Sequence, residues 1–264
     1  MRNNQTTNAA APKHEGRRFR AMFLLSLVAL AAVMFASLSL GSSTIGATDV
    51  AAFVAGNASD MANNVLANVR VPRVLGGVLV GTVVGMFNGV VISKTTIPPF
   101  IVTLATMNVA KGLAYVYTGG SPVRVVTKEW QFLGAGYVGG VPTPVILLAV
   151  VLVITAIIMN KTKLGRHIYA VGGNSQAARF SGISTAKVKF LVHTYSGIMA
   201  GLAGVVLASR MYSGQPTAGD GAEMDAIAAV VVGGTSMAGG SGKIGGTIIG
   251  GLIIGVLNNG LNLL

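Results

Sequence analysis

The chain has 264 residues, of which 52% are hydrophobic and only 10% are charged, and it contains no cysteine. Its mean hydropathy of +0.69 is higher than that of a typical soluble domain of this length. The absence of cysteine excludes disulfides, thiolate nucleophiles and cysteine-containing metal sites.

The apolar residues form blocks long enough to cross a bilayer, which predicts an all-α polytopic transmembrane helix bundle. A basic cytoplasmic tail at residues 1–20 precedes the first block at residues 21–40. Because this block is longer than the apolar core of a signal peptide, we expect it to stay as a membrane anchor. Six further candidate spans follow, at residues 74–93, 99–117, 143–160, 190–209, 226–240 and 244–264. The candidate at 226–240 is short and glycine-rich, which suggests a re-entrant or broken helix.

The charges support this assignment of spans. If the amino terminus is cytoplasmic and all seven segments cross, most of the 19 Lys and Arg residues lie inside, in the tail, at Lys94, in residues 161–189 and at Lys243. Only Glu15 of the seven acids then lies inside. The positive-inside rule requires this asymmetry. It also argues against binding to nucleic acid, despite the net charge of +12, because the basic residues form no single stripe.

Glycines recur at every fourth position of the second span, a spacing that lets another helix approach closely. The helix-packing glycines are Gly77, Gly81, Gly85 and Gly89. The pairs 197/201, 246/250 and 251/255 repeat the spacing in later spans. The chain also ends directly after an apolar run, which we interpret as a sign of truncation.

Two glycine-rich stretches resemble nucleotide-binding loops but lack the required context. The G-x-G-x-x-G at residues 134–139 follows no predicted strand and opens no helix. In the stretch ending at Lys243, Met237 replaces a required glycine, so we expect no ATP site. The spans hold no paired carboxylates and the three histidines are scattered, so no catalytic residue, metal site or bound cofactor is predicted.

Neutral amides in or beside the spans are candidate contacts for a hydroxyl-rich cargo, because an amide both donates and accepts hydrogen bonds. Hydrogen bonding between helices is the alternative role. We expect the side chain of Lys111 to extend toward the outer surface and His193 to contact a neighbouring helix. The candidate substrate-path residues are Asn88, Asn108, Asn258 and Asn259.

A basic loop at residues 162–189 contains a short helical segment that we expect to bind a partner protein. Asn174 or Ser175 can cap this helix, and Gly182 can end it. Two small alanines beside an exposed Phe180 would form a knob that a partner can grip, although a solvated loop that only sets topology is the alternative. The candidate docking residues are Gly172, Gly173, Asn174, Gln176, Ala177, Ala178, Arg179 and Gly182.

Four stretches resemble the monosaccharide permeases of ABC importers, of the ribose-transport type. They are residues 97–122, 165–184 (GRHIYAVGGNSQAARFSGIS), 213–247 and 253–264, and they cover roughly the last two-thirds of the chain. The resemblance implies a bacterial inner-membrane permease that pairs with a second permease copy. It also implies a periplasmic sugar-binding protein and cytoplasmic ATPase subunits, which use ATP and magnesium and dock on residues 172–182.

The amino-terminal third departs from that pattern. A glycine-and-aspartate motif expected near the start of sugar permeases is missing, and residues 39–57 and 69–81 resemble iron-siderophore and vitamin B12 permeases. We therefore expect a membrane domain at 21–264, siderophore-permease-like over 21–85 and sugar-permease-like over 86–264. The predicted function is import of a monosaccharide such as ribose. The alternatives are an iron-siderophore or cobalamin permease, or a truncated hybrid that transports nothing.

Overall fold

The computed structural model describes residues 71–124 and 128–261, together with residues 52, 55, 57 and 263. The basic tail, the first predicted span at 21–40 and most of the siderophore-permease-like segment lie outside the described residues. The described elements are α4 (Val71–Lys94), α5 (Pro99–Thr118), β1 (Val123–Arg124), α6 (Lys128–Ala135), β2 (Tyr137–Val138), β3 (Val141–Pro142), α7 (Thr143–Lys161), α8 (Lys163–Gly173), α9 (Ser175–Phe180), α10 (Thr185–Arg210), β4 (Ser213–Gly214), α11 (Ala222–Val232) and α12 (Ile244–Leu261).

The predicted fold class, an all-α polytopic membrane bundle, is confirmed. Within the described residues, α4, α5, α7, α10 and α12 are long and apolar enough to cross a membrane, and each overlaps a predicted span. Helix α10 begins at Thr185, five residues before the predicted start. Its first turn carries Lys187 and Lys189, so hydropathy alone does not include that turn in the span.

Helix α11 is too short to cross the membrane. It has 11 residues and is therefore about 16 Å long, about half the hydrocarbon core of a bilayer. The sequence predicted a re-entrant or broken helix at residues 226–240; α11 begins earlier, at Ala222, and ends at Val232, and Gly234 has a φ of +84°. Turns and irregular backbone occupy residues 233–243, which we call the hairpin loop. Helices α11 and α12 with this loop form the α11–α12 hairpin.

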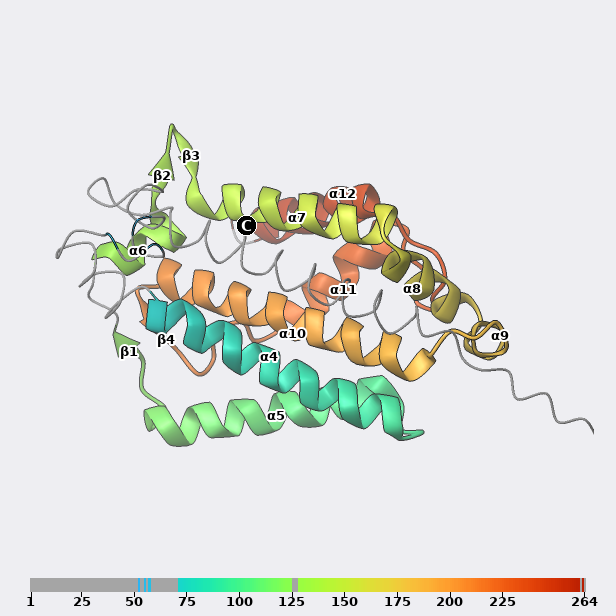
Figure 1. The fold of residues 1–264 in the computed structure, drawn as a ribbon. Helices are drawn as coiled ribbons and strands as arrows, with labels where there is room; N and C mark the ends of the chain where they lie inside the picture. Colours follow the sequence, from blue (N-terminus) through green and yellow to red (C-terminus); the bar gives the residue numbers. More distant parts are fainter. Residues whose placement is uncertain are drawn as a thin grey trace, which may run out of the picture.

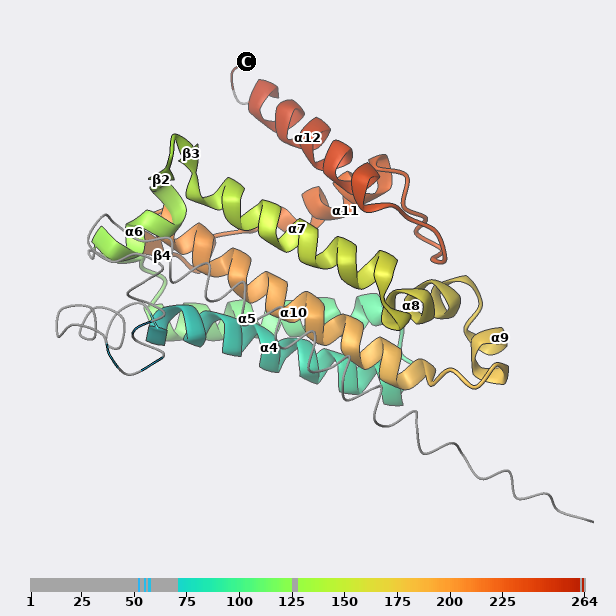
Figure 2. The same ribbon diagram turned by 45° about the horizontal axis from the view of Figure 1, so that its top comes forward.

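The long helices run side by side between two different ends (Figure 1). One end, the strand end, holds α6 and two short antiparallel strand pairs, β1 with β4 and β2 with β3. The other end holds α8 and α9, which together form the elbow. Figure 2 shows α12 projecting away from the layer that contains α4, α5 and α10. The basic residues 161–189 thus lie at the end opposite to the strands.

Backbone contact between α4 and α10 holds the centre of the bundle together. A Cβ added at Gly81 would lie 2.8 Å from the Cα of Gly201 and would also meet the carbonyl oxygen of Gly197. A Cβ at Gly85 would lie 2.6 Å from the carbonyl oxygen of His193. The structure thus places the glycine face of α4 directly against α10, where no side chain fits between the two backbones.

The other two glycines of that face lie at the ends of the same contact. A Cβ at Gly89 would lie 2.9 Å from the carbonyl oxygen of Phe190, and one at Gly77 would meet the side chain of Val205. The later glycine pairs differ from one another. Gly246 and Gly250 pack against α11, whereas a Cβ at 251 or 255 would meet nothing within 4 Å.

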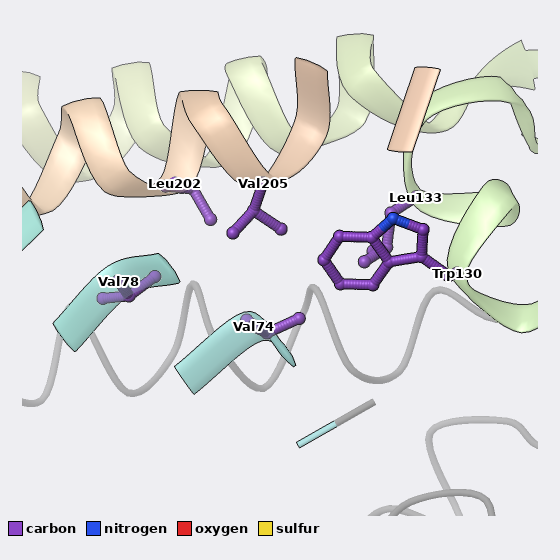
Figure 3. Close-up of a cluster of buried hydrophobic side chains, with 6 residues drawn as sticks. All are labelled: Val74, Val78, Trp130, Leu133, Leu202 and Val205. Carbon is purple, nitrogen blue, oxygen red and sulfur yellow. The ribbon is translucent and has the colours of Figure 1, made fainter. Parts of the chain in front are cut away.

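A small apolar core joins α4, α6 and α10 near the strand end (Figure 3). It consists of Val74, Val78, Trp130, Leu133, Leu202 and Val205. The buried Ser209 fixes α6 to the end of α10, because its hydroxyl donates to the carbonyl oxygen of Trp130 and accepts from the N–H of Gly134 at 2.7 Å. Helix α6 is therefore anchored to α10, the same helix that packs on the glycine face of α4.

Replacing Gly81 by Ala is expected to destabilise the bundle by about 1–3 kcal/mol, because the new methyl group overlaps the backbone of α10. Gly76→Ala is the matched control on the same helix, since a Cβ there meets nothing within 4 Å. The thermal unfolding midpoint of each purified variant in detergent gives the comparison. Equal midpoints for the two variants would contradict the close contact.

Candidate functional site

Asn174 joins the two helices of the elbow. Its backbone N–H donates to the carbonyl oxygen of Ala170 at 3.1 Å and so closes α8. Its side-chain oxygen accepts from the N–H groups of Gln176 and Ala177, at 3.0 and 2.9 Å, and so caps α9. Of the two caps considered from the sequence, Asn174 is therefore the one in the structure. Gly182, with a φ of +81°, follows the end of α9.

The two alanines of the predicted knob differ in exposure. Ala177 is exposed, but Ala178 is only 5% exposed and faces the bundle. The expectation that both alanines project toward a partner is therefore wrong for Ala178, because neighbouring residues on a helix point in different directions. Phe180 is 91% exposed. Four exposed residues of α9, which we call the α9 face, are Gln176, Ala177, Arg179 and Phe180.

Gly172 and Gly173 lie at the end of α8, and they contact the hairpin loop as well as leading into α9. A Cβ at Gly172 would lie 2.8 Å from the backbone nitrogen of Gly240. The hairpin loop thus partly covers these two candidate docking residues. The elbow is positioned from two sides, by Asn174 within it and by the hairpin loop beside it.

The four candidate substrate-path amides lie in different surroundings. Asn88 is 9% exposed, and its side-chain oxygen accepts from the hydroxyl of Thr106 at 2.7 Å, which ties α4 to α5. The amide of Asn108 donates to the carbonyl oxygen of Leu104 in its own helix. The structure does not gather the four amides around one point, and the hydrogen bond of Asn88 matches the alternative role of joining helices.

Helix α12 carries the other two amides, Asn258 and Asn259. The amide of Asn258 donates to a carboxylate oxygen of Asp225 at 3.0 Å and so ties α12 to α11. Asn259 is exposed. These residues place polar groups at the part of the α11–α12 hairpin farthest along the chain from its loop.

The sequence analysis missed an ion pair between α5 and the turn before α11. The ammonium of Lys111 lies 2.6 Å from a carboxylate oxygen of Asp220, and both side chains are partly exposed. Lys111 is about 10 Å from the end of α5 along the helix axis, so the pair lies within the depth of the span. Its side chain therefore meets a carboxylate, a partner that the sequence analysis did not identify, and the extension to the outer surface stays a prediction. A lone Lys in an apolar span was the available signal, because such a charge requires a partner.

Other polar contacts within the spans join helices or stay within one helix. The hydroxyls of Thr155 on α7 and Tyr195 on α10 lie 2.6 Å apart. The Nδ1 atom of His193 lies 2.8 Å from the carbonyl oxygen of Lys189 in its own helix. Among the described residues, no group of three His, Asp or Glu side chains is placed to hold a metal ion. These contacts serve packing and positioning.

Proteins of similar sequence are named as permeases. The family described as branched-chain amino acid transport system / permease component matches residues 17–264. The ribose import permease of Bacillus subtilis is 48% identical over 179 residues, which are 67% of this chain and 56% of that protein. The ribose import permease of Escherichia coli K12 is 46% identical over 188 residues, 70% of this chain and 59% of that protein. The L-arabinose transport system permease of Escherichia coli K12 is 40% identical over 177 residues, 67% of this chain and 54% of that protein.

The chain thus spans a little more than half the length of these relatives. No solved structure matches it. The family match includes residues 21–85, which the sequence analysis likened to siderophore permeases. The division of the membrane domain at residue 85 stays a prediction.

Reversing either charge of the Lys111–Asp220 pair is expected to lower the thermal unfolding midpoint, because two like charges then face each other within the span. The double variant Lys111→Asp/Asp220→Lys restores the attraction and is expected to recover most of the loss. Thermal unfolding of the two single variants and the double variant in detergent measures this coupling. A double variant as unstable as the sum of its parents would contradict a direct pair.

Proposed function

The chain belongs to the family of permease components described as branched-chain amino acid transport system / permease component, and we propose that it forms the membrane-spanning subunit of a monosaccharide importer. Its cargo on this proposal is a sugar such as ribose. The observation that carries the proposal is the 46–48% identity, over about two-thirds of the chain, to permeases named for ribose import. Permeases named for L-arabinose and D-allose are 40% identical over similar lengths.

The structure suits a transport subunit that performs no bond chemistry of its own. The described part of the chain contributes five helices long enough to span a bilayer, and the chain is a multi-pass protein of the inner membrane. ATP and magnesium are used by separate ATPase subunits in this proposal, and the subunit itself binds no cofactor. A second permease copy and a periplasmic sugar-binding protein complete the importer.

The α9 face is the proposed contact with the ATPase. It lies at the end of the bundle that holds the basic residues 161–189, which is the cytoplasmic end by the positive-inside rule. With the elbow inside, the predicted spans place the amino terminus inside as well. A 91%-exposed Phe180 beside the exposed Ala177 and Arg179 gives an aromatic and a guanidinium group, both common at protein interfaces.

Cells that produce this chain with a matching sugar-binding protein and ATPase are expected to accumulate labelled ribose. The uptake should disappear with an ATPase variant that cannot hydrolyse ATP, because the permease has no energy source of its own. A labelled ferric siderophore is the parallel cargo, since residues 39–57 resemble siderophore permeases. Siderophore uptake without sugar uptake would replace the sugar proposal. Membrane insertion with uptake of neither cargo would identify a protein that transports nothing.

Replacing Ala177 by Glu is expected to reduce co-purification with the ATPase at least about tenfold, equivalent to about 1.4 kcal/mol. The carboxylate would lose its hydrating water in the interface without gaining a hydrogen-bond or ion-pair partner there. Ala170→Glu makes the same change at an exposed site on α8 and is the matched control. Pull-down of the ATPase from detergent extracts gives both values. Equal retention by the two variants would exclude α9 as the docking segment.

A further inference from the structure

The end of α8 and the hairpin loop touch backbone to backbone. A Cβ at Gly239 would lie 2.6 Å from the carbonyl oxygen of Gly172, and one at Gly240 would lie 2.7 Å from the Cα of Gly173. Gly239 and Gly240 also have φ angles of +93° and +77°, which favour glycine. Two segments more than sixty residues apart in the sequence are therefore in direct contact with no side chain between them.

A hydrogen bond lies beside this backbone contact. The hydroxyl of Tyr169 donates to the carbonyl oxygen of Gly242 at 3.0 Å. Tyr169 precedes Gly172 and Gly173 by three and four residues, so all three lie on one face of α8. That face holds the hairpin loop at two successive places, around Gly240 and at Gly242.

The hairpin loop is itself compact. The N–H of Ser236 donates to the carbonyl oxygen of Ser241 at 3.1 Å, and that of Gly239 donates to the carbonyl oxygen of Ser236 at 3.1 Å. These bonds close residues 236–241 on themselves, so this part of the loop is compact.

Both ends of the loop continue directly into helices that are packed against each other. Gly233 follows α11, and a Cβ there would lie 2.8 Å from the backbone nitrogen of Thr247 on α12. A Cβ at Gly250 would lie 2.8 Å from the backbone nitrogen of Gly233. Helices α11 and α12 are thus held together near the loop, so movement of the loop moves both.

We infer that Tyr169 and Gly172 are positioning residues that transmit movement between the elbow and the α11–α12 hairpin. The α9 face follows Gly172 by only a few residues, so force from a bound ATPase reaches the hairpin loop through the end of α8. This inference rests on the proposed function, since it requires an ATPase bound at the α9 face. It adds the route by which ATPase binding at the α9 face acts on the α11–α12 hairpin.

Two glycine variants separate transmission from a general effect of replacing a helix glycine. Gly172→Ala adds a methyl group 2.8 Å from the backbone nitrogen of Gly240, whereas a Cβ at Gly204 on α10 meets nothing within 4 Å. Each variant exchanges one helix glycine for alanine. Gly172→Ala is expected to lower ATPase-dependent ribose uptake about fivefold or more, while Gly204→Ala uptake stays near wild type. Co-purification of Gly172→Ala with the ATPase is expected to stay near wild type, because Gly172 is not part of the α9 face.

A second variant and a direct readout cover the case in which Gly172→Ala fails to fold. Tyr169→Phe removes only the hydroxyl that donates to Gly242. Because the chain has no cysteine, a nitroxide at Met237→Cys reports on the hairpin loop alone, and Met237 is 82% exposed. Addition of the ATPase is expected to change the nitroxide spectrum in the otherwise wild-type chain and in Gly204→Ala, and to change it much less in Tyr169→Phe and Gly172→Ala.

The outcomes distinguish this inference from the proposed function. Failure of the wild-type chain to bind the ATPase would overturn the proposed function, and the inference with it. Normal ATPase binding with the same spectral change in all variants would overturn the inference alone. Equal loss of uptake in Gly172→Ala and Gly204→Ala would also overturn it, because it would show that the close approach at Gly240 has no special role.

Discussion

The arrangement of the bundle depends on the close approach of α4 and α10. Between apolar helices in a bilayer the hydrophobic effect supplies little attraction, so association relies on packing and on polar contacts. Glycines at 77, 81, 85 and 89 remove the side chains that would separate the two backbones. The other described parts of the fold are organised around this pair. Helix α6 is fixed to the end of α10 by Ser209, and α5 is tied to α4 by Asn88.

The α11–α12 hairpin is attached in a different way. Its loop lies against the end of α8, and backbone groups of the loop bond within the loop and with Tyr169. The turn before α11 forms backbone hydrogen bonds of its own. The ion pair of Asp220 with Lys111 adds a second attachment to the rest of the bundle. The hairpin is therefore held at separate points rather than along a continuous helix face.

Hydropathy and glycine spacing predicted much of this structure because both are local properties of the sequence. Each described span could be found from its own residues, and helix-capping chemistry narrowed the cap of α9 to Asn174 or Ser175. Long-range contacts could not be found in this way. The partner of Lys111 lies 109 positions away, and the burial of Ala178 depends on how a six-residue helix rests on its neighbours. The start of α10 was placed too late because lysines in its first turn resemble a loop.

The continuous glycine contact between α4 and α10 and the separate attachments of the hairpin divide the bundle into a part that resists movement and a part that can shift. Sliding α4 along α10 would bring Cα atoms and carbonyl groups into collision at several glycines at once, so that pair has one favoured register. The hairpin has no comparable row of contacts with α4 or α10 within the described residues. The attachments described above are one hydrogen bond from Tyr169, the ion pair of Asp220 just before α11, and the glycine contact with the end of α8. Breaking one of these costs far less than repacking a helix interface. On the proposed function, a transport cycle that alternates between two states moves the hairpin while α4 and α10 stay together.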